Sequence, residues 1–370
     1  MTNVNLPDAM KIIKEIFKLQ KNKEFNFVPI LQGNPGIGKT SYIKELAKKM
    51  DYDLYSISGA KSMEYFSGIP LTDKIIVTND EVGEAIWSKP EMIAKANRLA
   101  EKKNVILFID DIHLIGDGSS YLFELLLEKS LNNHKLKNNV FLIGASNLSS
   151  LSGFNGFPAA IINRMMLLPV ELQFKDWYKN VGINLNDYIT TFLKTNPEFI
   201  NEEEDSEKPF GTYRSWTEFS ILFNVLIQNK NEEEIQKIVY EVGQGFVSEI
   251  ALLSLKSSIK TQQKYNLKTI VSKKVFPLPK IDFVEQLIYV NIVKYCTTEN
   301  HFNKLKDLLI KTSKNEKYTT FNLNVIMEIL AIKDYLKENQ IENEKLKKID
   351  DFLNNLTLID NLNDIILKYL

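Results

Sequence analysis

One segment of eight residues, Gly33-Asn34-Pro35-Gly36-Ile37-Gly38-Lys39-Thr40, restricts the fold of this chain more than any other part of the sequence. It matches the pattern G-x-x-x-x-G-K-[ST] at every fixed position. The apolar run 27–31 precedes it, and a helical pattern of apolar residues follows it up to Met50. This pattern binds phosphate when it lies between a strand and the first turn of a helix. The sequence therefore predicts a nucleotide-binding loop over these eight residues, and we include the next residue, Ser41.

The residue types of this loop explain what it can hold. Glycines lack a Cβ, so the backbone can turn sharply and successive N–H groups can converge on one point. The helix N-terminus adds partial positive charge there. Lys39 is predicted to reach the β- and γ-phosphates, and the Thr40 hydroxyl is predicted to ligate Mg²⁺. The alternative interpretation, an ordinary glycine-rich turn before a helix, does not require the strand and helix patterns on either side.

Composition limits the class of protein. The chain has 370 residues and a formal net charge of −1, which gives no global attraction to nucleic acid. Cys296 is its only cysteine, so no disulfide can form within the chain, and a reducing, cytoplasmic setting is expected. The charges between Asp8 and Glu15 interrupt any apolar core of a secretory signal. No uncharged apolar run approaches the roughly 18 residues that a membrane span needs, so we expect no membrane association.

Between residues 25 and 172, strand patterns alternate with helical patterns. This alternation is typical of an α/β fold with a parallel sheet that is covered on both faces. The segment 72–87 is predicted to be a hairpin with its turn at Asn79 and Asp80. The predicted strands are 27–32, 53–57, 105–109, 140–145 and 166–170, and the predicted helices are 5–22, 39–50, 90–102 and 119–131.

Beyond residue 173 the pattern is helical and contains no strong strand signal. An acidic, solvated loop is expected at 201–207, and the lysine-rich stretch 255–274 is either a linker or an exposed helix. Within that stretch four lysines at i+4 spacing would form one basic helix face: Lys256, Lys260, Lys264 and Lys268. The predicted helices are 213–228 and 232–254, followed by helices near 281–296, 300–312, 322–338 and 341–355.

Polar side chains follow two of the predicted buried strands. Asp110 and Asp111 end the apolar run 105–109, and Asn147 ends the run 141–146. Ligands bind at the carboxyl ends of strands in an open parallel sheet. Asp110 is predicted to hold Mg²⁺, Asp111 to polarise the attacking water, and Asn147 to reach the γ-phosphate if its strand lies beside the one before the loop. Taken alone, each pattern is also typical of a strand that ends in a polar turn.

Two arginines are further candidates. Arg164 closes a predicted short helix just before a strand, where a fixed guanidinium suits a phosphoryl transition state. Arg214 lies at a predicted helix start beside Trp216. The alternatives are a surface arginine at 164 and a structural arginine stacked on an aromatic ring at 214. The three histidines are scattered and show no metal-site spacing, although His113 follows the two aspartates closely.

Taken in order, these motifs resemble an AAA+ ATPase, and more narrowly its MoxR-like, dynein-related group. The resemblance runs from about residue 28 to about residue 225 through GNPGIGKT, MEYFSGIPLTD, EAIWSKPEMI, ILFIDDIH, GASN, FPAAIINRM and TYRSW. It implies an αβα P-loop ATPase core (25–172) and an all-α lid (173–254). Outside the resemblance, the apolar periodicity predicts an N-terminal helix (1–24) and a C-terminal helical extension (255–370).

The resemblance also implies residue roles. Gly33 to Thr40 is the Walker A loop, and Asp110 and Asp111 are Walker B. Asn147 is sensor 1, and Arg214 is sensor 2. Arg164 resembles the arginine finger, which acts on ATP held by the neighbouring subunit. The segment 132–138 corresponds to a family hairpin that lines a central pore. MoxR-like proteins usually carry glutamate where this chain has Asp111, so slow hydrolysis is expected.

From these roles we expect an ATP- and Mg²⁺-dependent ATPase that assembles into a ring, usually a hexamer, with ATP at each subunit interface. Such a motor would remodel or assemble a protein partner, and relatives commonly act with a von Willebrand A-type protein. Two alternatives stay open. One is a DNA-acting AAA+ protein, such as a helicase loader or a restriction-type translocase, which the lysine row would support. The other is a nucleotide-gated scaffold with little turnover.

Overall fold

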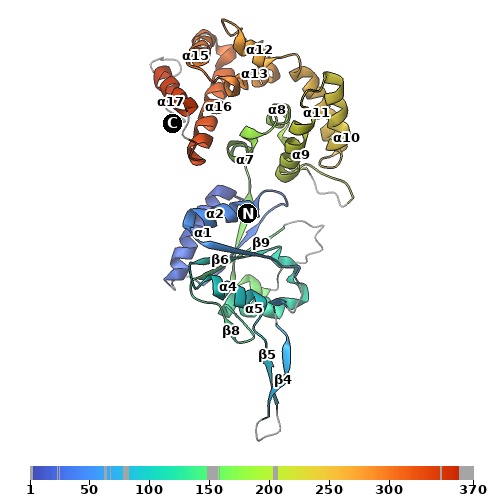
Figure 1. Ribbon diagram of the computed structural model, residues 1–370, viewed down its shortest axis with the longest axis vertical. Coiled ribbons are helices and arrows are strands. Elements are labelled where there is room, and N and C mark those ends of the chain that lie inside the picture. Colours follow the sequence, from blue (N-terminus) through green and yellow to red (C-terminus); the bar gives the residue numbers. More distant parts are fainter. Residues whose placement is uncertain are drawn as a thin grey trace. The chain divides into compact units, whose positions relative to one another are not determined.

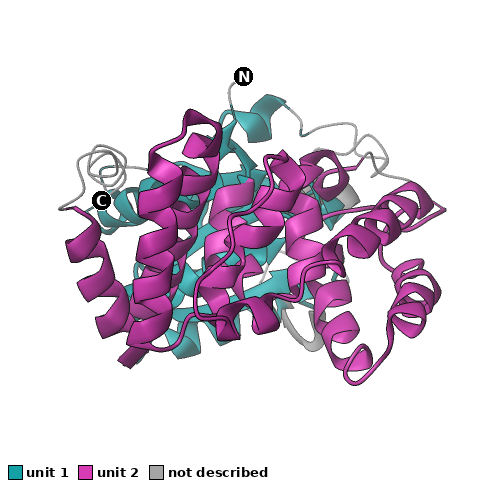
Figure 2. Cartoon of the chain, turned by 90° about the horizontal axis from the view of Figure 1, so that it is seen from above, with its two compact units in different colours: residues 1–173 teal, residues 174–370 magenta. Residues whose placement is uncertain are grey.

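The computed structural model describes residues 3–22, 24, 26–61, 65, 66, 68–77, 83–147, 157, 159–202, 207–341 and 344–357. The chain divides into two compact units, Met1–Gln173 and Phe174–Leu370 (Figures 1 and 2). Unit 1 contains a sheet with helices, and unit 2 is built from helices (Figure 1). None of the described helices is both long enough and apolar enough to span a bilayer.

A six-stranded sheet organises unit 1. Its spatial order is β1-β10-β2-β9-β6-β3, and every neighbouring pair is parallel. The predicted parallel sheet is thereby confirmed. Its strands are β1 (Val4–Asn5), β2 (Val28–Gln32), β3 (Asp53–Ser58), β6 (Val105–Asp110), β9 (Val140–Ser146) and β10 (Met165–Glu171).

Helices cover both faces of this sheet, because alternate strand residues point to opposite sides. On one face Phe141 of β9 meets Phe17 of α1 with ring centroids 5.2 Å apart. On the other face Leu142 joins a buried cluster with Ile93 of α4 and Leu125 of α5. The helices of unit 1 are α1 (Leu6–Lys21), α2 (Lys39–Met50), α4 (Glu91–Leu99), α5 (Ser119–Glu128) and α6 (Ala159–Ile162), with the 3-10 helix η1 (Ile112–Gly118).

Two hairpins complete unit 1. The predicted hairpin is present as the antiparallel pair β4 (Pro70–Val77) and β5 (Gly83–Trp87), and its predicted turn lies outside the described residues. A second hairpin, β7 (Ser130–Leu131) and β8 (His134–Lys135), overlaps the predicted pore-lining segment 132–138, which contains β8 but not β7. The expected helix 119–131 therefore ends early, at Glu128, because Lys129 turns the backbone with a φ of 51°. Strand β1 was not predicted, since two residues are too short for a period.

Unit 2 contains only helices and connections among its described residues. The predicted fold class, an αβα parallel sheet followed by a helical region, is confirmed, whereas the division into a lid and an extension stays a prediction. Its elements are α7 (Phe174–Asn180), η3 (Gly182–Asn184), α8 (Asp187–Thr195), η4 (Pro197–Ile200), α9 (Tyr213–Leu226), α10 (Glu232–Gly243), α11 (Glu249–Gln262), α12 (Leu267–Ser272), α13 (Phe283–Val290), α14 (Ile292–Tyr295), α15 (Glu299–Ser313), η5 (Glu316–Tyr318), α16 (Thr319–Glu338) and α17 (Glu344–Leu356).

The prediction of one helix over 232–254 was wrong. Helix α10 ends at Gly243. A new helix, α11, begins after Ser248, whose side chain accepts a hydrogen bond from the Ala251 N–H. Gly243 lets the two helices approach closely, because a Cβ there would lie 2.3 Å from a methyl group of Leu252. Similarly, the predicted helix 281–296 is divided at the buried Asn291 into α13 and α14.

The predicted basic helix face was also wrong. Helix α11 ends at Gln262, so Lys264 lies in a turn and Lys268 belongs to α12. The four lysines therefore do not share one helix. The stretch 255–274 is not a linker either, because Leu255, Ile259 and other apolar residues of it are buried. Of the acidic segment 201–207, residues 203–206 lie outside the described residues.

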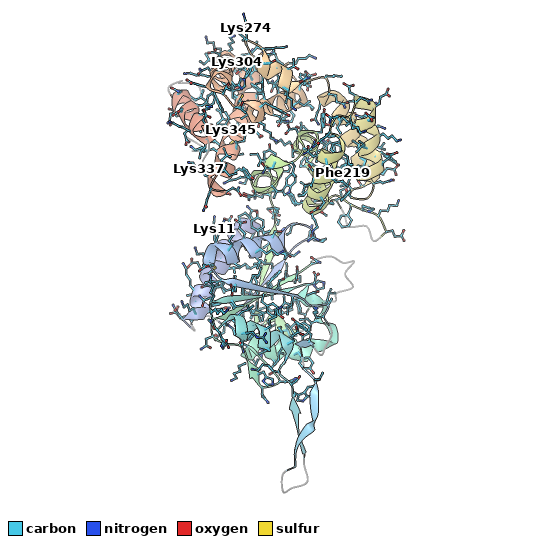
Figure 3. The ribbon with its side chains drawn as sticks, in the orientation of Figure 1. Lys11, Phe219, Lys274, Lys304, Lys337 and Lys345 are labelled. Atoms are coloured by element: carbon cyan, nitrogen blue, oxygen red, sulfur yellow. The ribbon has the colours of Figure 1, made fainter. Side chains whose placement is uncertain are left out.

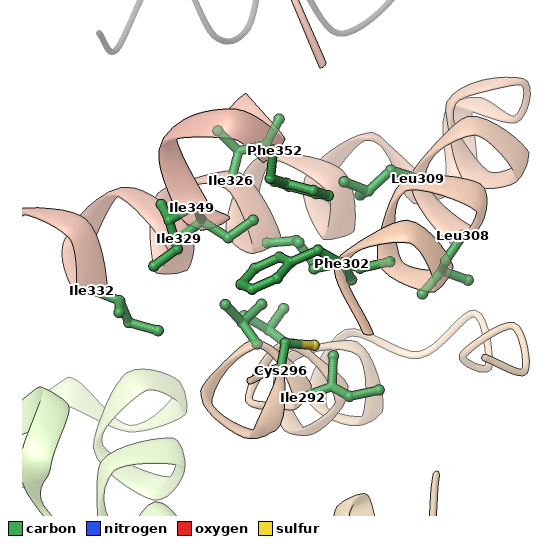
Figure 4. Close-up of a cluster of buried hydrophobic side chains, with 14 of the residues drawn as sticks. Ile292, Cys296, Phe302, Leu308, Leu309, Ile326, Ile329, Ile332, Ile349 and Phe352 are labelled. Atoms are coloured by element: carbon green, nitrogen blue, oxygen red, sulfur yellow. The ribbon is translucent and has the colours of Figure 1, made fainter. Parts of the chain in front are cut away.

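A large buried cluster joins α12 to α17 in unit 2. Aromatic and aliphatic side chains from α14, α15, α16 and α17 converge in it (Figure 4). Phe302 and Phe352 meet there with ring centroids 5.3 Å apart. Cys296 lies within this cluster, and burial raises the pKa of its thiol to about 12. A thiol held in this neutral form is a poor nucleophile.

Candidate nucleotide-binding site

Three neighbouring strands bring the candidate residues together at one edge of the sheet. Strand β9 lies between β2 and β6, so the carboxyl ends of all three meet. The glycine loop follows β2, Asn147 follows β9, and Asp110 and Asp111 follow β6. The condition set for Asn147, that its strand lie beside the one before the loop, is met.

The glycine loop has the backbone that its composition predicts. Gly36 and Gly38 have φ angles of 75° and 93°, which residues with a Cβ rarely adopt. Gly33 serves a different purpose: a Cβ on it would lie 2.6 Å from the Val170 carbonyl oxygen. Helix α2 begins directly after Gly38. Its N-terminal N–H groups and partial positive charge therefore face the loop.

The ammonium group of Lys39 lies inside this loop, and the residue is only 7% exposed. Its Nζ donates to the carbonyl oxygens of Gly33 at 2.7 Å and Asn34 at 3.0 Å. It also donates to Oδ1 of Asn147 at 2.9 Å. The loop carbonyls and the Asn147 amide thus hold the cation at the centre of the loop, where phosphate oxygens would be the stronger acceptors.

The two aspartates make different contacts. The Thr40 hydroxyl donates to Oδ2 of Asp110 at 2.7 Å, and Nδ2 of Asn147 donates to Oδ1 of Asp111 at 3.2 Å. Asn147 therefore connects Lys39 to Asp111. Asp111 has a φ of 50°, an uncommon conformation for a residue with a side chain and one that often marks functional sites.

Two residues beside the aspartates were missed or only weakly indicated by the sequence. Gly59, directly after β3, accommodates the Asp111 turn, because a Cβ on it would lie 2.3 Å from the Asp111 carbonyl oxygen. Its N–H donates to the Asp110 carbonyl at 2.7 Å. His113 is buried close to the site. Burial lowers the pKa of its imidazole, and the positive charge of Lys39 lowers this pKa further, whereas the negative charge of Asp111 raises it. A glycine two residues after the predicted strand 53–57 is the signal that could have indicated Gly59.

Arg164 lies in unit 1 but contacts other residues than the loop. Its guanidinium lies over the ring of Phe123, 4.1 Å from the centroid, and donates to the Ala160 carbonyl. It lies two residues after the short helix α6 and directly before β10, close to its predicted place at the end of a short helix. Half-buried and held against α5 and α6, the side chain is positioned by its own unit.

Arg214 belongs to unit 2, in the first turn of α9. Its side chain is exposed, whereas Trp216 is fully buried and donates from Nε1 to the Phe199 carbonyl at 2.7 Å. Trp216 packs against Phe192 and Phe219. Arg214 thus lies at the predicted helix start, and its role, as sensor 2 or as a structural arginine stacked on an aromatic ring, stays a prediction.

Comparison with known protein families agrees with this geometry. Residues 29–168, which run from β2 to β10, match the model of the ATPase family associated with various cellular activities (AAA). Residues 29–168 form an AAA ATPase domain. This AAA domain contains the glycine loop, both aspartates, Asn147 and Arg164. The matched model describes the AAA family broadly, so the MoxR-like subgroup stays a prediction.

Individual relatives are distant. The Lon protease of Leptospira interrogans is 28% identical over 189 residues, which are 47% of this chain and 19% of that protein. The chain thus spans about a fifth of the length of this curated relative. Among solved structures, the RuvB Holliday junction branch migration motor of Thermotoga maritima is 16% identical, covers 72% of this chain and 76% of its own, and has a TM-score of 0.35. A mutant of the same RuvB has a TM-score of 0.40 at 15% identity. We base no functional argument on these structural likenesses.

Proposed function

We propose that the AAA domain binds and hydrolyses ATP at the edge formed by the ends of β2, β9 and β6. The observation that carries the proposal is the hydrogen-bonded series from Lys39 through Asn147 to Asp111, beside the contact of Thr40 with Asp110. These contacts place a buried cation, an amide, a hydroxyl and two carboxylates around one glycine loop. Phosphoryl transfer depends mainly on positioning and charge stabilisation, which such a set can supply.

The residues also suit Mg²⁺. Thr40 and Asp110 present a hydroxyl and a carboxylate oxygen that are already within 2.7 Å of each other. Hard oxygen ligands of this kind are those that Mg²⁺ prefers. Thr40 and Asp110 would hold the ion, which when bound supplies charge neutralisation at the phosphate oxygens.

Each remaining residue has a separate task in the proposal. The loop from Gly33 to Ser41 encloses the phosphates, with the N–H groups after Pro35 as donors, and Lys39 exchanges its carbonyl partners for phosphate oxygens. Asp111 orients the attacking water, and Asn147 holds Asp111 and senses the γ-phosphate. The carboxylate of aspartate is one methylene shorter than that of glutamate, so hydrolysis is expected to be slow.

We further propose that the active unit is a ring, with six copies as the expected number. Arg164 would then complete the site of a neighbouring subunit, and Arg214 would respond to the nucleotide from the helical region. Hydrolysis would move the lid (173–254) and the hairpin at 132–138 against a protein partner, for which a von Willebrand A-type protein is the candidate. The resemblance of the motifs supports these assignments.

The DNA-acting alternative loses its main sequence support, because the four lysines do not share one helix face. No described feature favours it over a protein partner. The nucleotide-gated scaffold differs from the proposed enzyme only in turnover, so measuring phosphate release separates the two.

The test combines nucleotide binding with phosphate release. Lys39→Ala should abolish binding of a fluorescent ATP analogue, whereas Lys44→Ala, an exposed lysine of the same helix, should leave it unchanged. Arg164→Ala should leave binding by a single chain intact and stop phosphate release. Normal hydrolysis by the Arg164 variant would refute the shared site, and unchanged binding by the Lys39 variant would refute the proposed site itself.

A further inference from the structure

A cavity of about 670 Å³ opens in unit 2 where the ends of several helices meet. Its walls come from the start of α8, the connection between α9 and α10, the connection between α11 and α12, and the residues around the break between α13 and α14. Small-molecule sites typically have volumes of roughly 300–1,000 Å³. The cavity shares no residue with the proposed ATP site, so its lining needs an explanation of its own.

Side-chain amides dominate the walls of this cavity. Seven of its nineteen lining residues are asparagine or glutamine, and three more are the tyrosines Tyr188, Tyr265 and Tyr295. An amide presents an N–H donor and a carbonyl acceptor in one plane. A tyrosine adds an apolar ring on which a planar molecule can stack. The lining therefore suits a planar ligand that forms hydrogen bonds along its edge.

Two of the lining amides are buried and have a carbonyl oxygen without a partner. Gln262 is 4% exposed, and its Nε2 donates to the Tyr188 carbonyl at 2.9 Å and to the Ser258 hydroxyl at 3.1 Å, whereas its Oε1 accepts from no described residue. Asn291 is 1% exposed, and its Nδ2 donates to the Thr191 hydroxyl at 2.6 Å. Its Oδ1 has no partner among the described residues. Because buried polar groups are nearly always hydrogen-bonded, both carbonyls require a donor from a molecule in the cavity.

The walls also provide hydrogen-bond donors. The Nε2 of Gln263 has no partner among the described residues. Asn224 accepts from Nδ2 of Asn186 through its own Oδ1 at 3.1 Å, which leaves the Asn224 N–H groups for another acceptor. A matching ligand therefore carries N–H donors for the two buried carbonyls and an acceptor for these amide N–H groups.

The charged residues of the walls balance. Two carry negative and two carry positive charge: Asp187, Glu232, Lys230 and Lys268. Asp187 already accepts from Lys294 at 2.6 Å, so its carboxylate is neutralised within the protein. A lining without net charge gives no general attraction to phosphate or carboxylate groups. An uncharged ligand therefore suits this cavity better than a nucleotide does.

Packing and helix caps hold the walls in place. Phe219 of α9, labelled in Figure 3, is fully buried and stacks on Phe246 of the connection between α10 and α11, with ring centroids 5.8 Å apart. Two lining asparagines cap helices: Asn231 accepts from the third N–H of α10, and Asn266 accepts from the Thr269 N–H of α12 at 3.0 Å. Because these elements are already ordered, a ligand would lose little affinity to ordering them.

We propose that this cavity binds a small, uncharged molecule with a planar ring and an amino group, and that nucleosides with an exocyclic amino group are the class it takes. The amino group supplies N–H donors for the carbonyls of Gln262 and Asn291. A neighbouring ring nitrogen accepts from an amide N–H of the wall, and the ring stacks on a tyrosine, as bases do in protein sites. The inference goes beyond the proposed ATPase and does not depend on it.

The experiment is calorimetric titration of the chain with two matched pairs of nucleosides. Adenosine differs from inosine, and cytidine from uridine, by an amino group in place of a carbonyl oxygen. At least one amino-bearing nucleoside should bind, about tenfold or more tightly than its partner, because the partner leaves a buried acceptor unpaired. Adenosine monophosphate should bind no more tightly than adenosine. Glucose, which is uncharged but has no planar ring, should not bind.

Three of these titrations can overturn the proposal. It fails if neither adenosine nor cytidine binds, or if both pairs bind with equal affinity within each pair. Binding of glucose in preference to every nucleoside overturns it as well, since the walls would then recognise hydroxyl groups instead of a planar ring.

Variants locate the bound nucleoside. Asn224→Trp puts a large side chain at an exposed position of the wall and should block binding without lowering the unfolding temperature. Gln228→Trp, at a nearby exposed position that does not line the cavity, is the matched control and should bind normally. Gln262→Leu should weaken binding about tenfold or more through loss of its Oε1. Normal binding by both Asn224→Trp and Gln262→Leu would overturn the proposal.

A last variant separates the cavity from the proposed ATP site. Lys39→Ala should still bind the amino-bearing nucleoside, because the cavity contains no residue of the glycine loop. Loss of nucleoside binding in this variant alone would place the nucleoside at the loop and overturn the cavity proposal. Loss of phosphate release with normal nucleoside binding leaves the cavity proposal supported.

Discussion

The two units of this protein place buried charge in different settings. In unit 1, Lys39 and the two aspartates lie where strands end, and they contact one another through Asn147 and Thr40. In unit 2, Lys194 of α8 and Glu328 of α16 lie between helices, with side chains 14 and 4% exposed and a separation of 2.9 Å. Both sets contain a lysine and a carboxylate, yet only the first has partners that a ligand could replace.

The unit 2 network links four elements. Glu328 also accepts from the hydroxyl of Tyr178 of α7 at 2.5 Å, and Lys194 lies 4.0 Å from the centre of that ring. Beside it, Lys294 of α14 donates to Asp187 of α8 at 2.6 Å. Helices α7, α8, α14 and α16 are thus connected by buried or half-buried charge. Such a network is costly to break, because the group that remains is left buried without its counterion.

The difference shows that position in the fold decides what a lysine and a carboxylate do together. At the carboxyl ends of parallel strands, loops leave room for a ligand and point N–H groups at it. Between packed helices the same groups are enclosed by side chains. The unit 1 set therefore suits binding and exchange of partners, whereas the unit 2 set suits holding helices in register.

The largest effect that tests this contrast is expected for Glu328→Ala. Removing the carboxylate leaves Lys194 buried without its counterion, so the free energy of unfolding of unit 2 should fall by about 3–5 kcal/mol. Chemical denaturation followed by circular dichroism measures it. Glu338→Ala, an exposed glutamate of the same helix, is the matched control and should cost less than about 1 kcal/mol. Equal losses for the two variants would remove the distinction between buried and exposed charge.

Acidification should reproduce part of this loss. Burial opposes ionisation of Glu328, but the charges of Lys194 and Lys294 and the Tyr178 hydroxyl outweigh it and hold its pKa below the ordinary 4.5. A carboxyl with a lowered pKa contributes stability above its unfolded pKa and loses it as pH falls through the folded value. Stability of unit 2 should therefore decline below about pH 4.5, measured as the unfolding temperature. The decline should be shallower in Glu328→Gln; an identical slope would contradict the assignment.

In unit 1, Gly33→Ala should alter the loop itself. The added Cβ would meet the Val170 carbonyl oxygen at 2.6 Å and a methyl group of Ile37 at 2.7 Å. Overpacking of this kind typically lowers the free energy of unfolding by about 1–3 kcal/mol. The backbone shift that relieves it should also weaken ATP binding, which calorimetry can measure. Gly245→Ala is the control, because its Cβ would lie 3.6 Å from the nearest atom, an ordinary contact. Unchanged nucleotide affinity in the Gly33 variant would argue against the loop as the phosphate site.

The smallest effect is expected at an exposed helix cap of unit 2. The Asn231 side chain accepts from the Glu234 N–H, and the Glu234 side chain accepts from the Asn231 N–H. Asn231→Ala should cost about 1 kcal/mol in the free energy of unfolding. Glu233→Ala, at an exposed position two residues after Asn231, should change the free energy of unfolding less. A loss as large as that of Glu328→Ala would show that polar contacts at the surface of unit 2 matter as much as its buried network.

The sequence predicted β2, β6, β9 and β10 well because each is a short, mainly apolar run between turn signals. The run 105–109 is an example: all five residues are fully buried in β6. Prediction from the sequence was less successful with helix breaks, as the interruption of the predicted helix 232–254 after Gly243 shows. That break depends on a close approach to Leu252, a contact that local periodicity does not report. Strand β1 was missed because its pairing with β10 joins residues far apart in the chain.

The sequence alone indicated the candidate groups of the site, and their chemical roles stay predictions. Glycine spacing, a lysine and threonine after it, two aspartates after an apolar run and an asparagine after another each name a residue type with a known task. The adjacency of these groups came from the tertiary structure, because strand order brings residues 39, 110 and 147 within hydrogen-bonding distance. The same holds for Lys194 and Glu328, which no spacing connects and only helix packing brings together. Local pattern thus determines which groups a segment can offer, whereas long-range packing decides which of them meet.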